Sequence, residues 1–267
     1  MKNKKTKKHD IGILVSSCDE YADLWDPFFQ CFQKHWSDCE LPIYLMSNSK
    51  VFPNNIVKTL TTNHFKDWSS EMSQILDQYP HEYLLYIQDD YLFTGKVENV
   101  IINRLIDIMI TYSAGYLRLY PHPGKRKSIQ IYGNNEILEL VKGSPFVTSL
   151  QISLWHTQTF KNLLVSGETI WDFENYSPSR TIKLKRNLYS VPRIEEIANR
   201  VYAINYVCTA VRKGKWRKDA VEYCYQNNIS IDLSQRFVET NWDIFKKEVI
   251  YDHTPEFFRQ IMLRILW

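Results

Sequence analysis

Two adjacent carboxylates, Asp89 and Asp90, directly follow an apolar segment, residues 81–88. The segment predicts a buried strand, and open α/β sheets bind their ligands at the carboxyl ends of the strands. Mg²⁺ and Mn²⁺ take oxygen ligands, commonly one or two carboxylates together with substrate phosphates. Asp90 and Asp89 are therefore candidate metal ligands at a diphosphate site. A solvated turn or a helix cap is the alternative, which the apolar residues on both sides disfavour.

A second acidic group lies in residues 167–174, where Glu168, Asp172 and Glu174 are interleaved with aromatic residues. A carboxyl beside an apolar wall has a raised pKa, which suits a general base. Glu174 and Asp172 are therefore the candidate catalytic residues, and Trp171 is a candidate for stacking on a sugar ring. The alternative is the start of an amphipathic helix, where acids are favourable near the N-terminus.

Residues 146–155 predict one further strand. Its polar and aromatic members, Ser149, Gln151 and Trp155, alternate with aliphatic residues, so a strand would place them on one face. Gln151 and Trp155 are candidate acceptor-binding residues, and ordinary sheet packing is an equally common explanation.

Residues 212–218 carry five cations and a Trp around one Gly. Lys213 and Lys215 are candidates for holding a diphosphate, because a flexible Gly turn lets a Lys reach a leaving group. A solvated hairpin is the favoured alternative.

Alternating strands and helices are expected to position these side chains. Strands are predicted at 11–16, 42–47, 56–60, 81–88 and 115–120, and helices from Asp26, at 67–78 and over 97–109. This alternation over about 110 residues predicts an α/β fold with a mostly parallel central sheet flanked by helices. Short strands and turns follow over 121–143, and helical patterns dominate after residue 155.

The composition is that of a single folded domain. The chain has 267 residues, of which 44% are hydrophobic, so it has ample material for a core. It carries 33 Lys and Arg against 30 Asp and Glu, but five of the Lys lie in residues 1–9, and the remainder has 28 against 30. This near-neutral body disfavours a nucleic-acid partner. We expect residues 1–9 to be a disordered tail and residues 10–267 to be one domain, divided at residue 120.

Several site classes lack their sequence patterns. Five Cys, an odd number without C-x-x-C spacing, fit a reducing cytoplasm better than a disulfide scaffold. No G-x-G-x-x-G or P-loop pattern supports a dinucleotide or P-loop site, and no H-x-x-x-H pattern supports a zinc enzyme. No apolar stretch approaches the roughly 20 residues of a membrane span.

Together these segments resemble GT-A-fold, nucleotide-sugar-dependent glycosyltransferases of bacterial capsule, O-antigen and exopolysaccharide biosynthesis. The resemblance covers most of residues 10–216. It rests on four segments: residues 15–25 (VSSCDEYADLW), 83–91 (YLLYIQDDY), 149–155 (SLQISLW) and 171–174 (WDFE). It implies the GT-A fold and transfer of a sugar, most often a hexose, from a nucleotide-diphosphate sugar to a hydroxyl of a glycan or lipid-linked glycan, with Mn²⁺ or Mg²⁺ assisting.

The resemblance also implies roles for individual residues. The nucleotide would be contacted by three residues at the end of the first strand: Ser16, Ser17 and Asp19. Gln88-Asp89-Asp90 would take the place of the family's D-x-D signature, with Asp90 as the best metal ligand. The first position is Gln88 rather than Asp, which leaves the metal requirement open.

The remaining roles concern the acceptor and the leaving group. Glu174 or Asp172 would stand where inverting members place the base that deprotonates the acceptor, and Lys213 and Lys215 would approach the diphosphate. The stereochemistry, the donor and the acceptor stay open. The alternatives are a catalytically silent carbohydrate- or partner-binding protein and a sugar-phosphate nucleotidyltransferase, although residues 11–24 lack the Gly-rich loop of the latter.

The two ends of the chain give indications of where in the cell the protein is located. Residues 254–266 predict a helix with a broad apolar face, for which docking on the protein's own core is favoured over shallow membrane insertion. Each Lys of the tail near an anionic leaflet contributes about 1 kcal/mol. We expect a cytoplasmic protein, or one held peripherally at the inner face of the plasma membrane.

Overall fold

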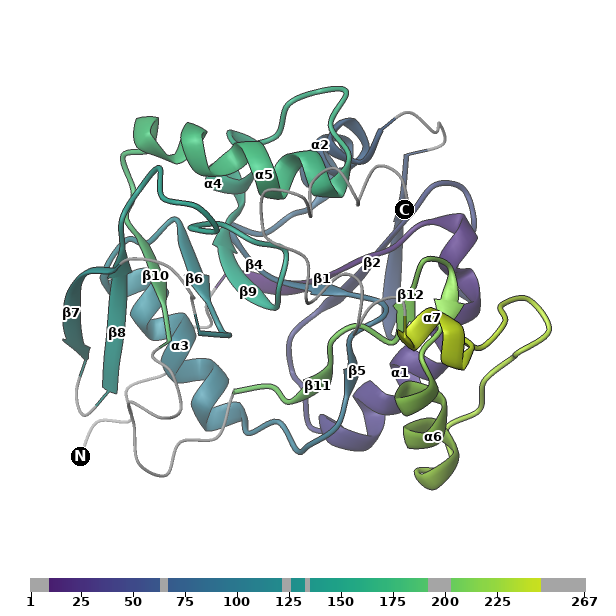
Figure 1. The fold of residues 1–267 in the computed structure, drawn as a ribbon. Coiled ribbons are helices and arrows are strands. Elements are labelled where there is room, and N and C mark those ends of the chain that lie inside the picture. The colour runs from purple at the N-terminus through teal and green to yellow at the C-terminus, as the bar shows by residue number, and fades with distance from the viewer. Residues whose placement is uncertain (1–9, 63–66, 122–125, 133–134, 192–202, 246–267) are drawn as a thin grey trace, which may run out of the picture.

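A nine-stranded sheet forms the centre of the protein (Figure 1). The computed structural model describes residues 10–62, 67–121, 126–132, 135–191 and 203–245. In spatial order the strands are β3 (Val57–Thr61), β2 (Ile43–Ser47), β1 (Ile11–Ser16), β4 (Tyr83–Gln88), β9 (Ser153–His156), β6 (Tyr116–Arg118), β10 (Leu188–Ser190), β8 (Asn135–Leu140) and β7 (Arg126–Tyr132). Strands β9 and β8 run against the others. The predicted fold class, a mostly parallel sheet flanked by helices, is confirmed.

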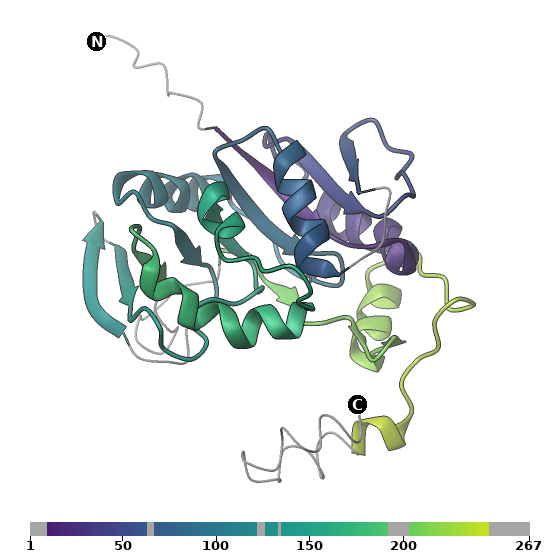
Figure 2. The ribbon, with the colours of Figure 1, turned by 90° about the horizontal axis from the view of Figure 1, so that it is seen from above.

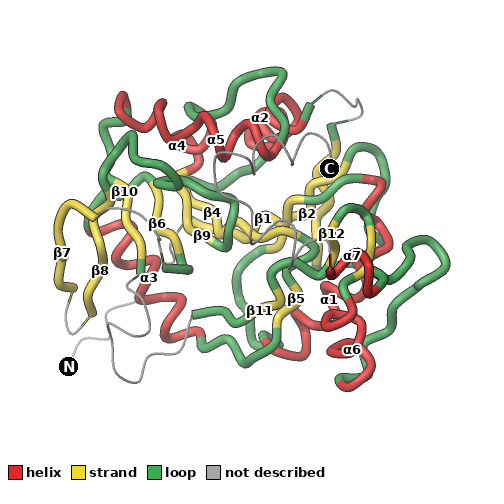
Figure 3. Tube along the Cα trace, viewed as in Figure 1, coloured by secondary structure: helices red, strands yellow, loops and turns green. Residues whose placement is uncertain are grey.

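Helices cover both faces of the sheet (Figures 1 and 2). One face carries α1 (Trp25–His35) and α3 (Asn99–Thr111), with α6 (Lys218–Gln226) packed beside α1; the other carries α2 (Trp68–Gln78), α4 (Thr157–Lys161) and α5 (Ile170–Arg180). The remaining elements are short: the 3-10 helices η1 (Asp19–Leu24) and η2 (Thr181–Lys183), the strand pairs β5 (Leu92–Phe93) with β11 (Tyr206–Val207) and β12 (Val211–Arg212) with β13 (Lys215–Trp216), and α7 (Asn241–Phe245). Figure 3 shows that loops connect most of the elements after α5.

The sheet divides the interior into two cores. Successive side chains of a strand point to opposite faces, so Ile13 of β1 and Leu85 of β4 pack in the core with α1 and α3. Leu14 and Leu84 pack in the other core, with α2 and α5. Strands buried on both faces are continuously apolar, which explains why β1 and β4 are recognisable in the sequence.

The predicted strand at 146–155 is wrong over most of its length. Only Ser153–His156 forms a strand, β9, and residues 141–152 form a loop. Gly143 and Phe146 have positive φ angles, +80° and +59°, which an extended strand excludes. The period-two argument for Ser149 and Gln151 therefore fails, because neither residue lies in a strand.

Two predictions fall outside the described residues: the basic tail, 1–9, and the apolar helix, 254–266. Among the residues that the structure describes, no helix is both long enough and apolar enough to span a bilayer. The division into halves at residue 120 stays a prediction.

Tyr79 joins the start of β1 to the start of β4. Its hydroxyl accepts a hydrogen bond from Gly12 N at 2.9 Å and donates one to Tyr83 O at 3.1 Å, and the side chain is buried.

Tyr79→Phe is expected to lower the free energy of unfolding by about 1–3 kcal/mol, because a buried N–H and a buried carbonyl lose their partner. Urea unfolding measures the change. Tyr225→Phe is the control, since Tyr225 is 62% exposed; equal losses in the two variants would contradict the assignment.

Candidate functional site

The loops after β1 and β4 meet at one edge of the sheet. Ser16 and Gln88 are paired in the parallel register of these strands, so the residues that follow lie side by side at the carboxyl ends. The Ser17 hydroxyl donates a hydrogen bond to the Asp89 carboxylate, and Trp25 Nε1 donates to Ser17 Oγ at 2.7 Å. The predicted position of the acid pair at this edge is thus observed.

Both carboxyls of the acid pair, Asp89 and Asp90, are buried, with exposed fractions of 5% and 8%. Burial raises the pKa of Asp89 well above its ordinary value, and the charge of Asp90 raises it further. Burial likewise raises the pKa of Asp90 to about 7. A surface turn, the alternative for this pair, is excluded. The buried negative charge is only partly compensated by its neighbours.

Arg236 is the cation next to the acid pair. Its guanidinium binds both oxygens of Asp23, at 2.9 and 3.0 Å, and lies over the Tyr21 ring at 4.4 Å. It also donates to the carbonyls of Gly214 and Glu20, both at 3.1 Å. Its charge lowers the pKa of both members of the acid pair against the larger effect of burial. No local sequence pattern points to Arg236, because it reaches the site only through the fold.

Asp19 connects the loops after β1 and β2. Its carboxylate accepts hydrogen bonds from the Ser47 hydroxyl at 2.6 Å and from the backbone N–H groups of Asn48, Ser49 and Lys50. Burial raises its pKa, but these hydrogen bonds together with the Ser49 hydroxyl outweigh burial and hold the pKa below its usual range. Its carboxylate is therefore committed within the protein, and its contact with a nucleotide stays a prediction.

Ser16 and Gln88 end the two strands at the same level. Ser16 is buried, and its hydroxyl accepts a long hydrogen bond from Trp68 Nε1 at 3.5 Å. The Gln88 amide donates to the Tyr86 hydroxyl at 3.4 Å. The nucleotide contacts predicted for Ser16 and Ser17 also stay predictions.

Helix α5 places Glu174 toward the acid pair and Asp172 away from it. The Glu174 carboxylate accepts a hydrogen bond from Leu150 N at 2.7 Å, and burial raises its pKa although Arg118 lowers it. Asp172 forms a capping box with Thr169, whose hydroxyl and backbone lower the Asp172 pKa. Asp172 thus caps the N-terminus of α5, which is the alternative explanation for this acidic group. Glu174 has the buried environment that is expected of a base.

Trp171, at the start of α5, is 74% exposed. An exposed indole suits the predicted stacking on a sugar. Trp155, by contrast, is fully buried and stacks on Phe160 with ring centroids 4.5 Å apart. Its prediction as an acceptor-binding residue is wrong, because β9 lies inside the sheet and Trp155 fills a core.

The loop 149–152 links the acid pair to Glu174. The Tyr91 hydroxyl donates to Leu150 O at 3.4 Å, while Leu150 N binds Glu174. The Tyr206 ring packs against Tyr91 in a tilted arrangement, with centroids 4.8 Å apart, and its hydroxyl donates a hydrogen bond to the Gln151 side chain. Gln151 therefore lies in the site, although in a loop rather than in a strand.

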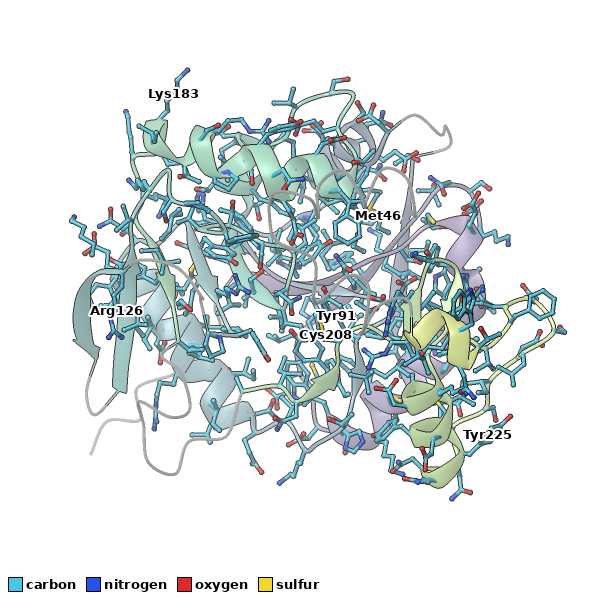
Figure 4. All side chains as sticks on the ribbon, viewed as in Figure 1. Met46, Tyr91, Arg126, Lys183, Cys208 and Tyr225 are labelled. Atoms are coloured by element: carbon cyan, nitrogen blue, oxygen red, sulfur yellow. The ribbon has the colours of Figure 1, made fainter. Side chains whose placement is uncertain are left out.

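Cys208 lies near both acidic groups. Its thiol accepts a hydrogen bond from Gln151 Nε2 at 3.3 Å. Burial raises its pKa most, and the charges of both Asp90 and Glu174 are close enough to raise it as well. Figure 4 shows Cys208 next to Tyr91 near the middle of the molecule. The acid pair and Glu174 thus belong to one site, and a lone Cys in a loop gave no sequence signal for it.

The basic run 212–218 is centred on a tight hairpin of β12 and β13. Its turn residues, Lys213 and Gly214, have φ angles of +51° and +69°, as two-residue hairpin turns require. Lys215 pairs with Asp243 at 3.0 Å. The favoured alternative, a hairpin, is confirmed. Arg236 joins its turn to the acid pair, and contact of Lys213 or Lys215 with a diphosphate stays a prediction.

The donor set fits a divalent cation. Two buried carboxylates whose charge is only partly compensated offer the oxygen ligands that Mg²⁺ and Mn²⁺ prefer. In the described part of the chain, no group of three or more His, Cys, Asp or Glu side chains could hold a metal. Asp89 and Asp90 would therefore share such an ion with oxygens of a ligand.

Comparison with known proteins gives only distant likenesses. No family model and no curated protein matches the chain. Residues 1–349 of S. aureus TarS align with 70% of this chain at 10% identity and a TM-score of 0.45, and the same segment in complex with UDP aligns with 69% at 9% identity and 0.44. This chain spans 61% and 60% of those two chains. A cytidylyltransferase from Leptospira borgpetersenii aligns with 82% of this chain and 95% of its own, at 10% identity and 0.41. Likenesses this remote carry no argument about activity.

Asp90→Asn is expected to stabilise the protein at pH 8 in buffer free of divalent cations. The pKa of Asp90, about 7, lies above its unfolded value of 3.8, so the folded state holds a proton that the unfolded chain has lost. Wild-type stability therefore falls as the pH rises from about 4 to 7, by a few kcal/mol, and Asn removes this loss. Urea unfolding at several pH values measures it.

Asp232→Asn is the matched control for this prediction. The pKa of Asp232 is lowered by hydrogen bonds from Ser234, so the same substitution there is expected to reduce stability at pH 8. An Asp90→Asn protein that is no more stable than wild type at pH 8 would contradict the assignment.

Arg236→Met is expected to lower the free energy of unfolding by about 3–5 kcal/mol, because it leaves a buried carboxylate unpaired; the Asp23 side chain is 2% exposed. The double variant with Asp23→Leu should regain part of the loss, since both charges are then removed. Arg186→Met serves as a control at a partly exposed arginine that binds a backbone carbonyl, Ser113 O. Thermal or urea unfolding measures all three, and similar losses at Arg186 and Arg236 would refute the role of the pair.

Proposed function

We propose that the protein is a glycosyltransferase of the hexosyltransferase class, which moves a sugar from a nucleotide-diphosphate sugar to a hydroxyl of a glycan or lipid-linked glycan. The observation that carries this proposal is the meeting of a buried acid pair and a third, separately held carboxylate at the carboxyl edge of the sheet. One acidic group suits a metal-bound diphosphate and the other suits a base.

The donor would bind beside the acid pair. A divalent ion held by Asp89 and Asp90 would stabilise the negative charge that builds on the leaving diphosphate. Ser17 holds the Asp89 carboxylate in place, and Arg236 supplies a fixed positive charge next to both carboxylates. The indole of Trp171 is open to stacking on a sugar.

The acceptor would bind beside Glu174. If transfer inverts the anomeric centre, a carboxylate must take the proton of the attacking hydroxyl. Glu174 has a raised pKa and a fixed orientation through Leu150 N, whereas the Asp172 carboxylate is held by its own helix cap. We therefore assign the base to Glu174 rather than to Asp172.

Calorimetry with UDP-, GDP- and CMP-sugars, with and without Mn²⁺, tests the proposal first. We expect one nucleotide sugar to bind, more tightly with Mn²⁺, and to be slowly hydrolysed. Absence of both binding and hydrolysis would refute the proposal. Release of pyrophosphate from a nucleoside triphosphate and a sugar phosphate would instead identify a nucleotidyltransferase. Donor binding with neither hydrolysis nor transfer would identify a binding protein.

Glu174→Gln is expected to lower the rate of transfer by about 10²–10⁴-fold, because it removes the base, and to leave donor affinity unchanged. Asp172→Asn is the matched control on the same helix and should keep near-normal activity. Asp90→Ala should lose the Mn²⁺-dependent part of donor binding. Steady-state transfer assays and calorimetry distinguish these effects. Full transfer activity in Asp90→Ala would reject the metal site, and full activity in Glu174→Gln would reject the inverting base.

A further inference from the structure

Arg118 is a buried arginine at the carboxyl end of β6. It is 7% exposed, and it is paired in register with Ser153 of β9 and Ser190 of β10. Arg118 and Tyr116 lie on the sheet face that carries α5, because Tyr116 packs in the core with Phe173. Arg118 therefore lies at the same edge of the sheet as the acid pair, on the side of Glu174.

The guanidinium has few partners for its five N–H donors. Among the described residues, its hydrogen bonding consists of one long contact, from Nη1 to Phe146 O at 3.5 Å. Its Nε is buried with no hydrogen-bond partner, and the described residues place no carboxylate in an ion pair with it. A charge kept out of water is costly unless it is paired and hydrogen-bonded. Within the part of the chain that the structure describes, Arg118 thus has no anion hydrogen-bonded to its guanidinium.

The groups around Arg118 belong to the candidate site. The Glu174 carboxylate and the Tyr206 hydroxyl are both close enough for the charge of Arg118 to lower their pKa values against the effect of burial. Phe146, whose carbonyl faces the guanidinium, is 55% exposed and has a positive φ. The loop 141–152 therefore lies over Arg118, and its one contact there is weak enough for an anion to replace.

We propose that Arg118 binds an acidic group, a carboxylate or a phosphate, of the sugar acceptor, and so makes the protein selective for acidic acceptors. The proposal rests on the glycosyltransferase function above. An acidic group of the acceptor is favoured over one of the donor, because the charge of Arg118 acts on Glu174, whereas the cation that acts on the acid pair is Arg236. Guanidinium groups form paired hydrogen bonds with either anion.

Three probes separate the sources of the anion: methyl glucuronide for a carboxylate, glucose 6-phosphate for a phosphate, and methyl glucoside as the neutral counterpart. Calorimetry on the full chain, loaded with the nucleotide sugar that it binds, measures each. We expect one acidic probe to bind at least about tenfold more tightly than the neutral one, a difference of about 1.4 kcal/mol. Equal affinities, or no binding of either acidic probe, would overturn the proposal.

Variants at Arg118 test whether it carries this preference. Arg118→Met should reduce the affinity for the acidic probe to that of the neutral probe, and Arg118→Lys should keep part of the preference, because it keeps the charge but not the planar fork. Arg186→Met is the control and should keep all of it. The affinity for the nucleotide sugar reports folding in each variant. Retained preference in a folded Arg118→Met protein would overturn the proposal; if that variant does not fold, Arg118→Lys with an unchanged preference would do so.

The outcome also separates this proposal from the function on which it rests. A chain that binds its nucleotide sugar but treats the three probes alike would refute the acidic acceptor alone. A chain that binds no nucleotide sugar, yet binds an acidic probe through Arg118, would refute glycosyl transfer and keep the anion site.

Discussion

Negative charge buried at the end of β4 is the constraint on which the surrounding structure depends. Asp89 and Asp90 follow a strand that is covered on both faces, so their carboxyls lie where water cannot solvate them freely. Two neighbouring segments stabilise that charge. The loop after β1 supplies a hydrogen bond from the Ser17 hydroxyl, and the C-terminal segment supplies the positive charge of Arg236. Two carboxylates that are buried here without full charge compensation lower the free energy of unfolding. In the function that we propose, a divalent cation would supply the missing positive charge.

The second half of the site is organised by a loop rather than by a strand. Residues 149–151 use their backbone and side chains to connect Tyr91, Glu174 and Tyr206. In a regular strand, these backbone N–H and C=O groups would instead form hydrogen bonds with neighbouring strands. Gly143 and Phe146 have positive φ angles, which a strand excludes, and the loop that contains them provides the backbone N–H that binds Glu174.

The sequence predicted the sheet and the acid pair well, because both depend on local pattern. Strands β1 and β4 are buried on both faces and are continuously apolar, and the pair follows β4 without a gap.

Other features are not predictable from local sequence. The loop at 141–152 is one of them, because Phe146 is a residue type that rarely adopts a positive φ. Trp155 was misassigned because a Trp suits a core as well as a sugar face. Cys208 and Arg236 reach the site from more than a hundred residues along the chain, where no local pattern records the contact. Arg118 lies inside the predicted strand 115–120, and the strand-end rule applies to it only in the structure, where β6 ends at Arg118.

The pairing of Asp23 with Arg236 has a consequence for biosynthesis. The two residues are separated by 213 positions, and chains are made from the N-terminus at about 5–20 residues per second. Strands β1 and β4 with their acid pair leave the ribosome well before the arginine is added. Arg236 lies 146 positions after Asp90, so for roughly 7–30 seconds at those rates the nascent chain carries the acid pair without this cation. The carboxyl edge of the sheet is consequently one of the last parts of the protein to reach its final electrostatic state.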